Sequence, residues 1–201
     1  MSEGGAYAAW LVDLDGTLYA AKPVQLAMGA EVALLGWSSL SILRRFRQEL
    51  EHVRSLDLEG DPFMLQVART ADALGQTPAR VEATARHWML ERPSKWISLF
   101  RRRPLLDEIQ SFRATGGRTA LVSDYPARRK LEALGAAQLF DVVVAPGELG
   151  APVRLKPHPG GALRAAAALG VDPSRCLMIG DRLDTDGKVA ENAGMAFRLV
   201  R

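Results

Sequence analysis

Two aspartates, Asp13 and Asp15, end an apolar run and are followed directly by Gly16 and Thr17. Burying a carboxylate costs free energy unless it is paired, hydrogen-bonded or bound to a metal, and an ordinary Asp-Gly turn would explain only one of the two. Residues two apart in a strand point to the same side, so both carboxylates can share one pocket. One of them can then attack phosphorus and form an aspartyl-phosphate, while the other supplies a proton to the leaving group and removes one from water.

A second acidic group follows a later apolar run, in the segment 180–188. It contains Asp181, Asp184 and Asp186, and carboxylate oxygens are the ligands that suit Mg²⁺. We predict that Asp181 binds the metal directly and that Asp186 assists, through a water or through another ligand. Asp184 could equally be solvated or cap a helix.

Phosphoryl transfer also needs positive charge and hydrogen-bond donors on the phosphoryl oxygens. Lys156 lies in a loop that is stiffened by Pro157 and Pro159, and Ser123 follows the apolar run 120–122. Either residue alone is uninformative, but both follow predicted strands, as the aspartates do.

The elements that must position these residues begin with a short apolar run over 7–14, typical of a strand buried on both faces. From about residue 22 to 103 helical spacing takes over, and Ser38-Ser39, Asp61 and Thr77 are suited to cap helices. A further helix is expected over 104–117. Beyond it, strand and helix patterns alternate to the end of the sequence, which indicates a parallel sheet flanked by helices.

The expected fold class is therefore α/β, with a Rossmann-like parallel sheet, helices on both faces and an inserted α-helical block after the first strand. In such sheets ligands bind beyond the carboxyl ends of the strands. Asp13, Ser123 and Asp181 all stand at such ends, so we expect these side chains to converge.

The assembled motifs resemble those of the haloacid dehalogenase (HAD) superfamily. Residues 13–17 match its DxDGT motif, Ser123 and Lys156 stand where its second and third motifs require, and residues 180–186 match GDxxxxD. The resemblance implies a catalytic core at 1–19 and 104–201. It also implies that residues 20–103 are similar to the family's C1 cap.

The resemblance also implies a role for each residue of the site. Asp13 would be the nucleophile, and Asp15 the general acid and then base, with its backbone carbonyl on Mg²⁺. The metal ligands implied are Asp13, Asp15 through that carbonyl, Asp181 and, in assistance, Asp186. Ser123 and Lys156 would hold the phosphoryl group, and Thr17 would brace the loop beside it.

The function expected is a Mg²⁺-dependent phosphatase that hydrolyses a small organic phosphomonoester through an aspartyl-phosphate. A phosphomutase and a dehalogenase of the same superfamily are alternatives, and so is a non-catalytic binding protein on this fold. Asp15 argues against the dehalogenase, because expelling halide from carbon needs no proton. The motifs do not identify the substrate.

Composition is that of an ordinary globular protein: 201 residues, 48% hydrophobic, with a net charge of +3. The single cysteine excludes an internal disulfide framework, and we see neither a secretory signal nor an apolar run of about 20 residues, so we expect a cytoplasmic protein. Arginines cluster at 44–47 and 101–103. We interpret them as a solvated helical face rather than a nucleic-acid site, or as groups that attract an anionic substrate. The expected partner is a small phosphorylated metabolite, without nucleic acid or membrane, and the protein a monomer or homodimer.

Overall fold

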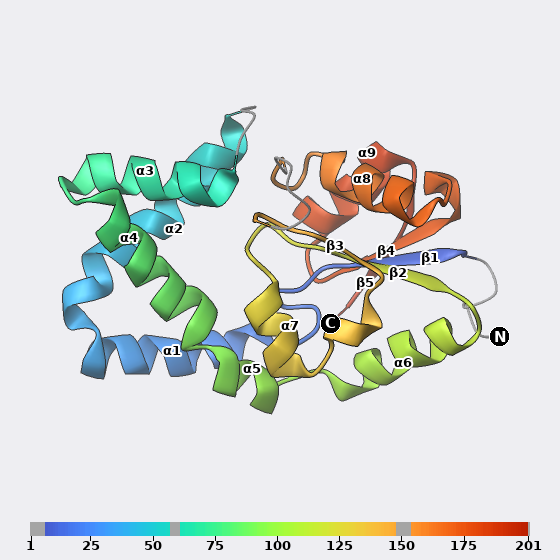
Figure 1. Cartoon of the computed structure of the whole chain (residues 1–201), viewed down its shortest axis with the longest axis horizontal. Helices are drawn as coiled ribbons and strands as arrows, with labels where there is room; N and C mark the ends of the chain where they lie inside the picture. The colour runs from blue at the N-terminus through green and yellow to red at the C-terminus, as the bar shows by residue number, and fades with distance from the viewer. Residues whose placement is uncertain (1–6, 57–60, 148–153, 201) are drawn as a thin grey trace.

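The computed structural model describes residues 7–56, 61–147 and 154–200. It contains a five-stranded parallel sheet, which lies in the right half of Figure 1. The strands run in the order β3-β2-β1-β4-β5. Their bounds are β1 Ala9–Val12, β2 Arg118–Val122, β3 Val142–Val144, β4 Cys176–Gly180 and β5 Ala196–Leu199. β1 pairs with β2 on one side and with β4 on the other. The carboxyl ends of these three strands therefore lie next to one another, and the predicted fold class is confirmed.

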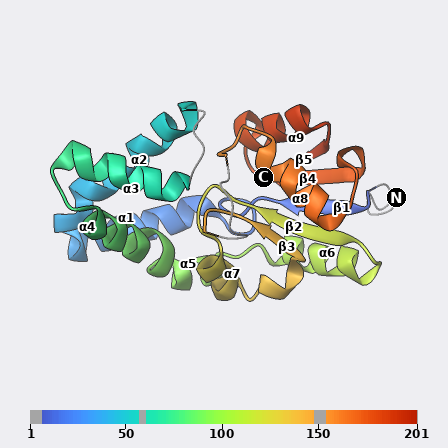
Figure 2. The same cartoon turned by 45° about the horizontal axis from the view of Figure 1, so that its top comes forward.

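Helices cover both faces of the sheet (Figure 2). One face carries α6 and α7, and the other carries α8 and α9. Their bounds are α6 Arg103–Ala114, α7 Arg128–Leu134, α8 Gly160–Leu169 and α9 Lys188–Ala193, with short turns at η4 Ala137–Leu139, η5 Pro173–Arg175 and η6 Leu183–Gly187. Along β1, Trp10 and Val12 pack toward α6 and α7, while Ala9 and Leu11 pack toward α8 and α9. Because both faces are buried, the strand is a continuous apolar run.

Between β1 and β2 the chain forms a group of helices beside the sheet, which we call the inserted helices (Figure 1). They are α1 Ala21–Leu35, η2 Trp37–Ser39, α2 Leu40–Ser55, α3 Pro62–Leu74, α4 Pro78–Ala85, η3 Arg86–Glu91 and α5 Ser94–Leu99. Asp61 and Thr77 cap α3 and α4 as predicted, since each side chain accepts a backbone hydrogen bond. The prediction for the serines is wrong. Ser39 already has helical φ and ψ of −93° and −10°, whereas a capping residue needs an extended backbone.

The inserted helices have a hydrophobic core of their own, in which Phe46 of α2 is fully buried against Phe63 of α3. Their ring centroids are 5.5 Å apart with the planes at 64°, an edge-to-face contact. We expect Phe46→Ala to lower the free energy of unfolding by about 3–5 kcal/mol, because truncation loses apolar burial and leaves a cavity. Urea denaturation followed by circular dichroism measures this. The control is Leu34→Ala at a side chain that is 82% exposed, and equal losses in the two variants would contradict the assigned core.

Among the described residues, no single helix is both long and apolar enough to cross a membrane. The stretches Ala21–Leu35 and Trp37–Ser55 reach that length only together, and the chain bends by 108° between them.

Candidate active site

The ends of β1 and β4 bring three carboxylates together. Asp13 follows β1, and its backbone N–H donates to the carbonyl of Ile179 in β4 at 2.9 Å. One carboxylate oxygen from each of Asp13, Asp181 and Asp186 lies within 4.8 Å of the others. Three of the residues predicted to hold a metal therefore converge, although Asp13 and Asp181 are far apart in the sequence.

The acidic cluster occupies space that is free only because two neighbouring residues are glycines and carry no side chain. Gly16 has a φ of +97°, and a Cβ on it would come within 2.1 Å of the Asp181 carboxylate. A Cβ on Gly180 would come within 2.4 Å of Asp186. Any other residue at either position would displace a carboxylate, so both glycines are required by the geometry of the site.

Lys156 binds this cluster from the loop before α8. Its Nζ lies 2.5 Å from Oδ1 of Asp13 and 2.7 Å from Oδ1 of Asp186, and the residue is only 4% exposed. Burial lowers the pKa of the ammonium, but the two carboxylates outweigh burial and raise it, so Lys156 is charged. On the other oxygen of Asp13, the hydroxyl of Thr17 donates a hydrogen bond at 2.9 Å. Both oxygens of Asp13 therefore accept hydrogen bonds from Lys156 and Thr17, two residues that were predicted to belong to the site.

The charge of the site fits a divalent cation. Burial, together with the neighbouring carboxylates of Asp186 and Asp15, raises the pKa of Asp13 to about 7, although Lys156 opposes the rise. Burial and Asp186 also raise the pKa of Asp181. A single ammonium does not balance three close carboxylates, and oxygen-only ligands around a space bounded by glycines suit Mg²⁺.

Metal binding at this cluster should depend on pH through Asp13. A cation must displace the proton that Asp13 holds below its pKa of about 7, so the affinity should rise with pH and level off above that value. We expect the dissociation constant for Mg²⁺ to be about tenfold larger at pH 6 than at pH 8. Calorimetry in buffers of different ionisation enthalpy would measure both the constant and the protons released. A constant that does not change with pH, with no proton release at pH 6, would contradict the prediction.

Asp15 stands apart from this cluster and has other partners. Nζ of Lys130 in α7 lies 2.6 and 2.7 Å from its two oxygens, and the hydroxyl of Tyr19 donates to Oδ1. Burial would raise the pKa of Asp15, but Lys130 and the Tyr19 hydrogen bond outweigh it and lower the pKa. In this arrangement Asp15 is a carboxylate that can accept a proton. The metal role predicted for Asp15 concerned its backbone carbonyl and stays a prediction.

Lys130 is the functional candidate that sequence reasoning missed. It lies in α7, in the part of the chain for which the sequence indicates only an alternation of strands and helices, and it is 5% exposed. A lysine in a basic run such as 128–130 is usually solvated, and only the tertiary fold shows that this one faces Asp15.

The loop after β2 holds Ser123 and connects the site to the inserted helices. Ser123 is buried, and its hydroxyl donates to the carbonyl of Tyr125 at 3.0 Å, so it is turned toward its own loop. Asp124, for which the sequence suggested no role, accepts the backbone N–H of Lys156 at 2.9 Å. It also forms a salt bridge of 2.9 Å with Arg54 of α2. Asp124 thereby ties the lysine loop to the inserted helices.

Asp184 does not join the acidic cluster. Its side chain is 70% exposed and pairs with Arg182 at 2.7 Å. Of the two open interpretations, the structure bears out a solvated carboxylate, held by a neighbouring arginine.

The sequence matches a known family along most of its length. Residues 7–194 match the family described as haloacid dehalogenase-like hydrolase. Phosphoserine phosphatase of Thermus thermophilus is 31% identical over 170 residues, which are 80% of this chain and 63% of that protein. Glyceraldehyde 3-phosphate phosphatase of Methanopyrus kandleri is 40% identical over 72 residues, 36% of this chain and 30% of that protein.

N-acylneuraminate-9-phosphatase of Rattus norvegicus is 38% identical over 68 residues, 34% of this chain and 26% of that protein. The matched segments thus span less than two thirds of the length of each of these relatives.

Solved structures share the fold. L-2-haloacid dehalogenase of Xanthobacter autotrophicus superposes with a TM-score of 0.66 at 20% identity, covering 96% of this chain and 77% of that one. A HAD phosphatase of Thermococcus onnurineus superposes with a TM-score of 0.60 at 22% identity, covering 96% and 86%. At such identities the likeness concerns the fold alone.

Proposed function

The chain belongs to the haloacid dehalogenase-like hydrolases, and we propose that it is a Mg²⁺-dependent phosphatase acting on a small organic phosphomonoester. The phosphatases among its relatives support this, as does the second aspartate of the first motif. The observation that carries the proposal is the environment of Asp13. It is a buried carboxylate that accepts hydrogen bonds from Lys156 and Thr17, and one of its oxygens lies within 4.8 Å of an oxygen of Asp181 and of Asp186.

We propose that residues 1–19 and 104–201 are the catalytic core and that residues 20–103 are a C1-type cap. Enclosing the substrate between the two would exclude water from the reaction and select the leaving group. The separate hydrophobic core of the inserted helices supports this division. The salt bridge between Arg54 of α2 and Asp124 of the core loop joins the two parts beside Lys156.

In the first half of the reaction, an oxygen of Asp13 attacks phosphorus and the bond to the leaving oxygen breaks. Lys156 holds the phosphoryl oxygens together with Ser123, whose hydroxyl must exchange its bond to the carbonyl of Tyr125 for one to the phosphoryl group. Asp15 gives its proton to the leaving oxygen. To do so, Asp15 must exchange its contact with Lys130 for a proton. Asp13, Asp181 and Asp186, together with the backbone carbonyl of Asp15, would hold Mg²⁺, which when bound offsets the charge of the carboxylates and the phosphoryl group.

In the second half, water attacks the phosphorus of the aspartyl-phosphate. Asp15 accepts a proton from this water, and the bond between phosphorus and Asp13 breaks, releasing phosphate and restoring the carboxylate. The contacts of Asp15 with Lys130 and Tyr19 stabilise its ionised form, which is the form required of the base.

The test is phosphate release from a broad panel of phosphorylated metabolites, with and without Mg²⁺. We expect release from at least one member with Mg²⁺ present and a strong loss when the metal is chelated. Halide release from chloroacetate or fluoroacetate would instead support the dehalogenase. Isomerisation of a sugar phosphate without net release would support the mutase, and no turnover of any member would support a binding protein.

A further inference from the structure

Three consecutive arginines, 101–103, stand where the chain returns from the inserted helices to α6. Arg101 pairs with Tyr19 in an antiparallel bridge, so the backbone is extended at this point. In extended backbone, neighbouring side chains point to opposite sides and those two residues apart point to the same side. Arg102 turns toward the loop after β1, where its Nη2 donates to the carbonyl of Gly16 at 3.3 Å. The same rule places Arg101 and Arg103 together on the other side.

A cavity of about 220 Å³, which we call the α6 cavity, lies between α6 and η4. Arg101 and Arg103 line it, whereas Arg102 does not. The rest of its wall consists of Leu106, Asp107, Gln110, Gly135, Gln138 and Leu139. A cavity of about 150 Å³ holds a benzene-sized body, so the α6 cavity has room for a small organic molecule.

The positive charge at the α6 cavity is not balanced by the described part of the chain. There, the side chains of Arg101 and Arg103 have neither a hydrogen bond nor a salt bridge, and the first turn of α6 contains no acidic residue. Among the described residues of the wall, only Asp107 has a carboxylate. Like charges held close together destabilise the folded chain, and an anion between them removes that cost. Because a guanidinium binds phosphate through two parallel hydrogen bonds, a phosphate group fits this pair.

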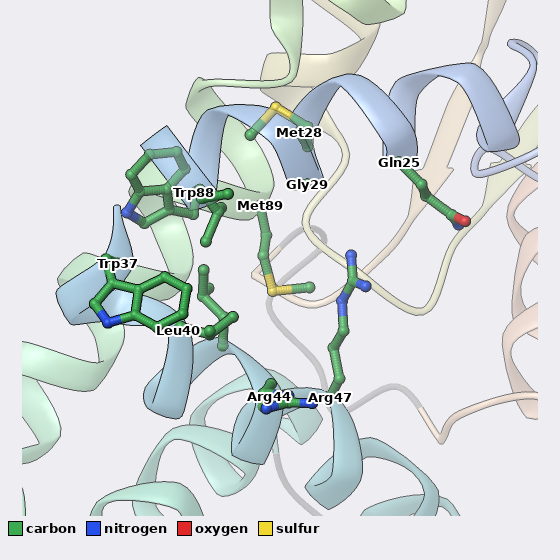
Figure 3. Close-up of a pocket in the computed structure, with 12 residues that line it drawn as sticks. Gln25, Met28, Gly29, Trp37, Leu40, Arg44, Arg47, Trp88 and Met89 are labelled. Carbon is green, nitrogen blue, oxygen red and sulfur yellow. The ribbon is translucent and has the colours of Figure 1, made fainter. Parts of the chain in front are cut away.

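A second cavity, of about 190 Å³, lies between α1 and α2 and differs in its lining (Figure 3). Trp37 and Trp88 form one end of it, and Arg47 lies at the other end. A phosphate against the tryptophans would lose its hydration and gain few hydrogen bonds in return. In the α6 cavity, Gln110 and Asp107 can exchange hydrogen bonds with hydroxyl groups. The α6 cavity is therefore the one suited to a hydroxylated phosphate.

Through Arg101, the α6 cavity contacts the two segments that join the inserted helices to the sheet, 18–20 and 100–102, which we call the linker pair. Two backbone hydrogen bonds connect these segments. The N–H of Ala20 donates to the carbonyl of Phe100 at 3.0 Å, and the N–H of Arg102 donates to the carbonyl of Leu18 at 2.8 Å. Because Arg101 lies between these bonds in the chain, a ligand that it holds should stabilise the linker pair.

We propose that the α6 cavity binds a small phosphate-bearing molecule with hydroxyl groups, that Arg101 and Arg103 hold its phosphate, and that the bound molecule stabilises the linker pair. None of the residues that line the cavity belongs to the acidic cluster at Asp13, so this site is a different one. The molecule bound there is an effector of the protein, and its binding does not depend on the proposed phosphatase function.

Binding is measured by calorimetry in EDTA, with glycerol 3-phosphate as the probe and with orthophosphate and glycerol for comparison. Without a divalent cation, the three carboxylates around Lys156 disfavour a phosphate at Asp13, and no turnover is expected. We expect glycerol 3-phosphate to bind at least tenfold more tightly than orthophosphate, because its hydroxyl groups add hydrogen bonds. Glycerol should not bind measurably. Equal dissociation constants for glycerol 3-phosphate and orthophosphate would overturn the assignment of a hydroxylated ligand in favour of free phosphate.

Replacing both arginines, Arg101→Met with Arg103→Met, should raise the dissociation constant of glycerol 3-phosphate at least tenfold. Methionine keeps an apolar stem, and no partner in the described residues loses a hydrogen bond, so this variant should fold. Gln110→Glu should also weaken binding, because it adds a carboxylate to the wall. The matched control is Arg44→Met with Arg80→Met. It removes the same charge at two exposed arginines outside the α6 cavity and should keep the wild-type dissociation constant.

The effect on the linker pair is followed by hydrogen exchange at the amides of Ala20 and Arg102. With glycerol 3-phosphate at a hundred times its dissociation constant, exchange at both amides should slow by about 10- to 100-fold, because opening of the linker pair must then release the ligand. The amide of Leu65, which donates to the carbonyl of Asp61 in α3, serves as the reference and should exchange at an unchanged rate. In the variant that lacks both cavity arginines, no amide should slow.

The measurements can overturn each part of the proposal. If glycerol 3-phosphate binds equally to the wild type and to the variant without Arg101 and Arg103, or if the control variant weakens binding as much, the site is wrong. If it binds through these arginines but Ala20 and Arg102 exchange at unchanged rates, the effect on the linker pair is wrong. Phosphate release takes no part in these measurements, so a failure of the proposed phosphatase function would show in the metabolite panel alone.

Discussion

Asp13→Asn is expected to lower kcat by about 10⁴-fold or more on every substrate, because an amide cannot form the aspartyl-phosphate. The side chain keeps its shape. Its amide oxygen can accept from Lys156, and its NH2 group can donate to the Thr17 hydroxyl, which in the wild type donates to Asp13. The fold should survive, since burial disfavours the charge that the substitution removes. Phosphate release measures the first expectation and thermal unfolding followed by circular dichroism the second.

The matched control for this variant is Asp184→Asn, which removes the same charge four residues beyond the end of β4 but at an exposed side chain. It should keep kcat within about twofold of the wild type. Retained activity in purified Asp13→Asn would refute the nucleophile assignment. A loss in both variants alike would point to a general effect of charge rather than to a covalent role.

The sheet and its helices could be predicted because their signals are local. A strand buried on both faces reads as an apolar run, and β1 does so. Asp61 and Thr77 precede prolines, so their capping follows from the adjacent sequence. The capping prediction for Ser39 was wrong because the residues before it already form the short helix η2, and the presence of a serine does not reveal this.

The acidic cluster could be predicted for a different reason. Asp13 and Asp181 each follow a strand, and in a parallel sheet the strand ends share one edge. No such rule brings Lys130 to Asp15, or Arg54 to Asp124, because each pair joins a helix to a loop through tertiary packing alone. The partners of Asp15, which decide its protonation, therefore could not be predicted from the sequence.

The contact of Asp15 with Lys130 has a consequence for the catalytic cycle. An aspartate bound by an ammonium through both oxygens is ionised, which suits the base and opposes the acid. The two halves of the proposed reaction therefore need Asp15 in two environments. The arrangement seen here corresponds to the second half, after the leaving group has taken its proton.

The acid role of Asp15 leads to the second large effect, on substrates with poor leaving groups. We expect Asp15→Asn to lower kcat/KM for an alkyl phosphate by about 10²–10⁴-fold, because no proton reaches the alkoxide as it leaves. For p-nitrophenyl phosphate the loss should stay near tenfold or less, since p-nitrophenolate leaves without a proton. Steady-state kinetics on the two substrates measure the difference.

The same variant separates the acid role from the base role. With p-nitrophenyl phosphate the first half-reaction needs no acid, while the second still lacks its base. A burst of p-nitrophenol close to one per enzyme, followed by slow turnover, is therefore expected. Tyr19→Phe is the control, because it removes one hydrogen bond to Asp15 and leaves the carboxyl in place. Equal losses on the alkyl and aryl substrates, without a burst, would mean that Asp15 positions the substrate and transfers no proton.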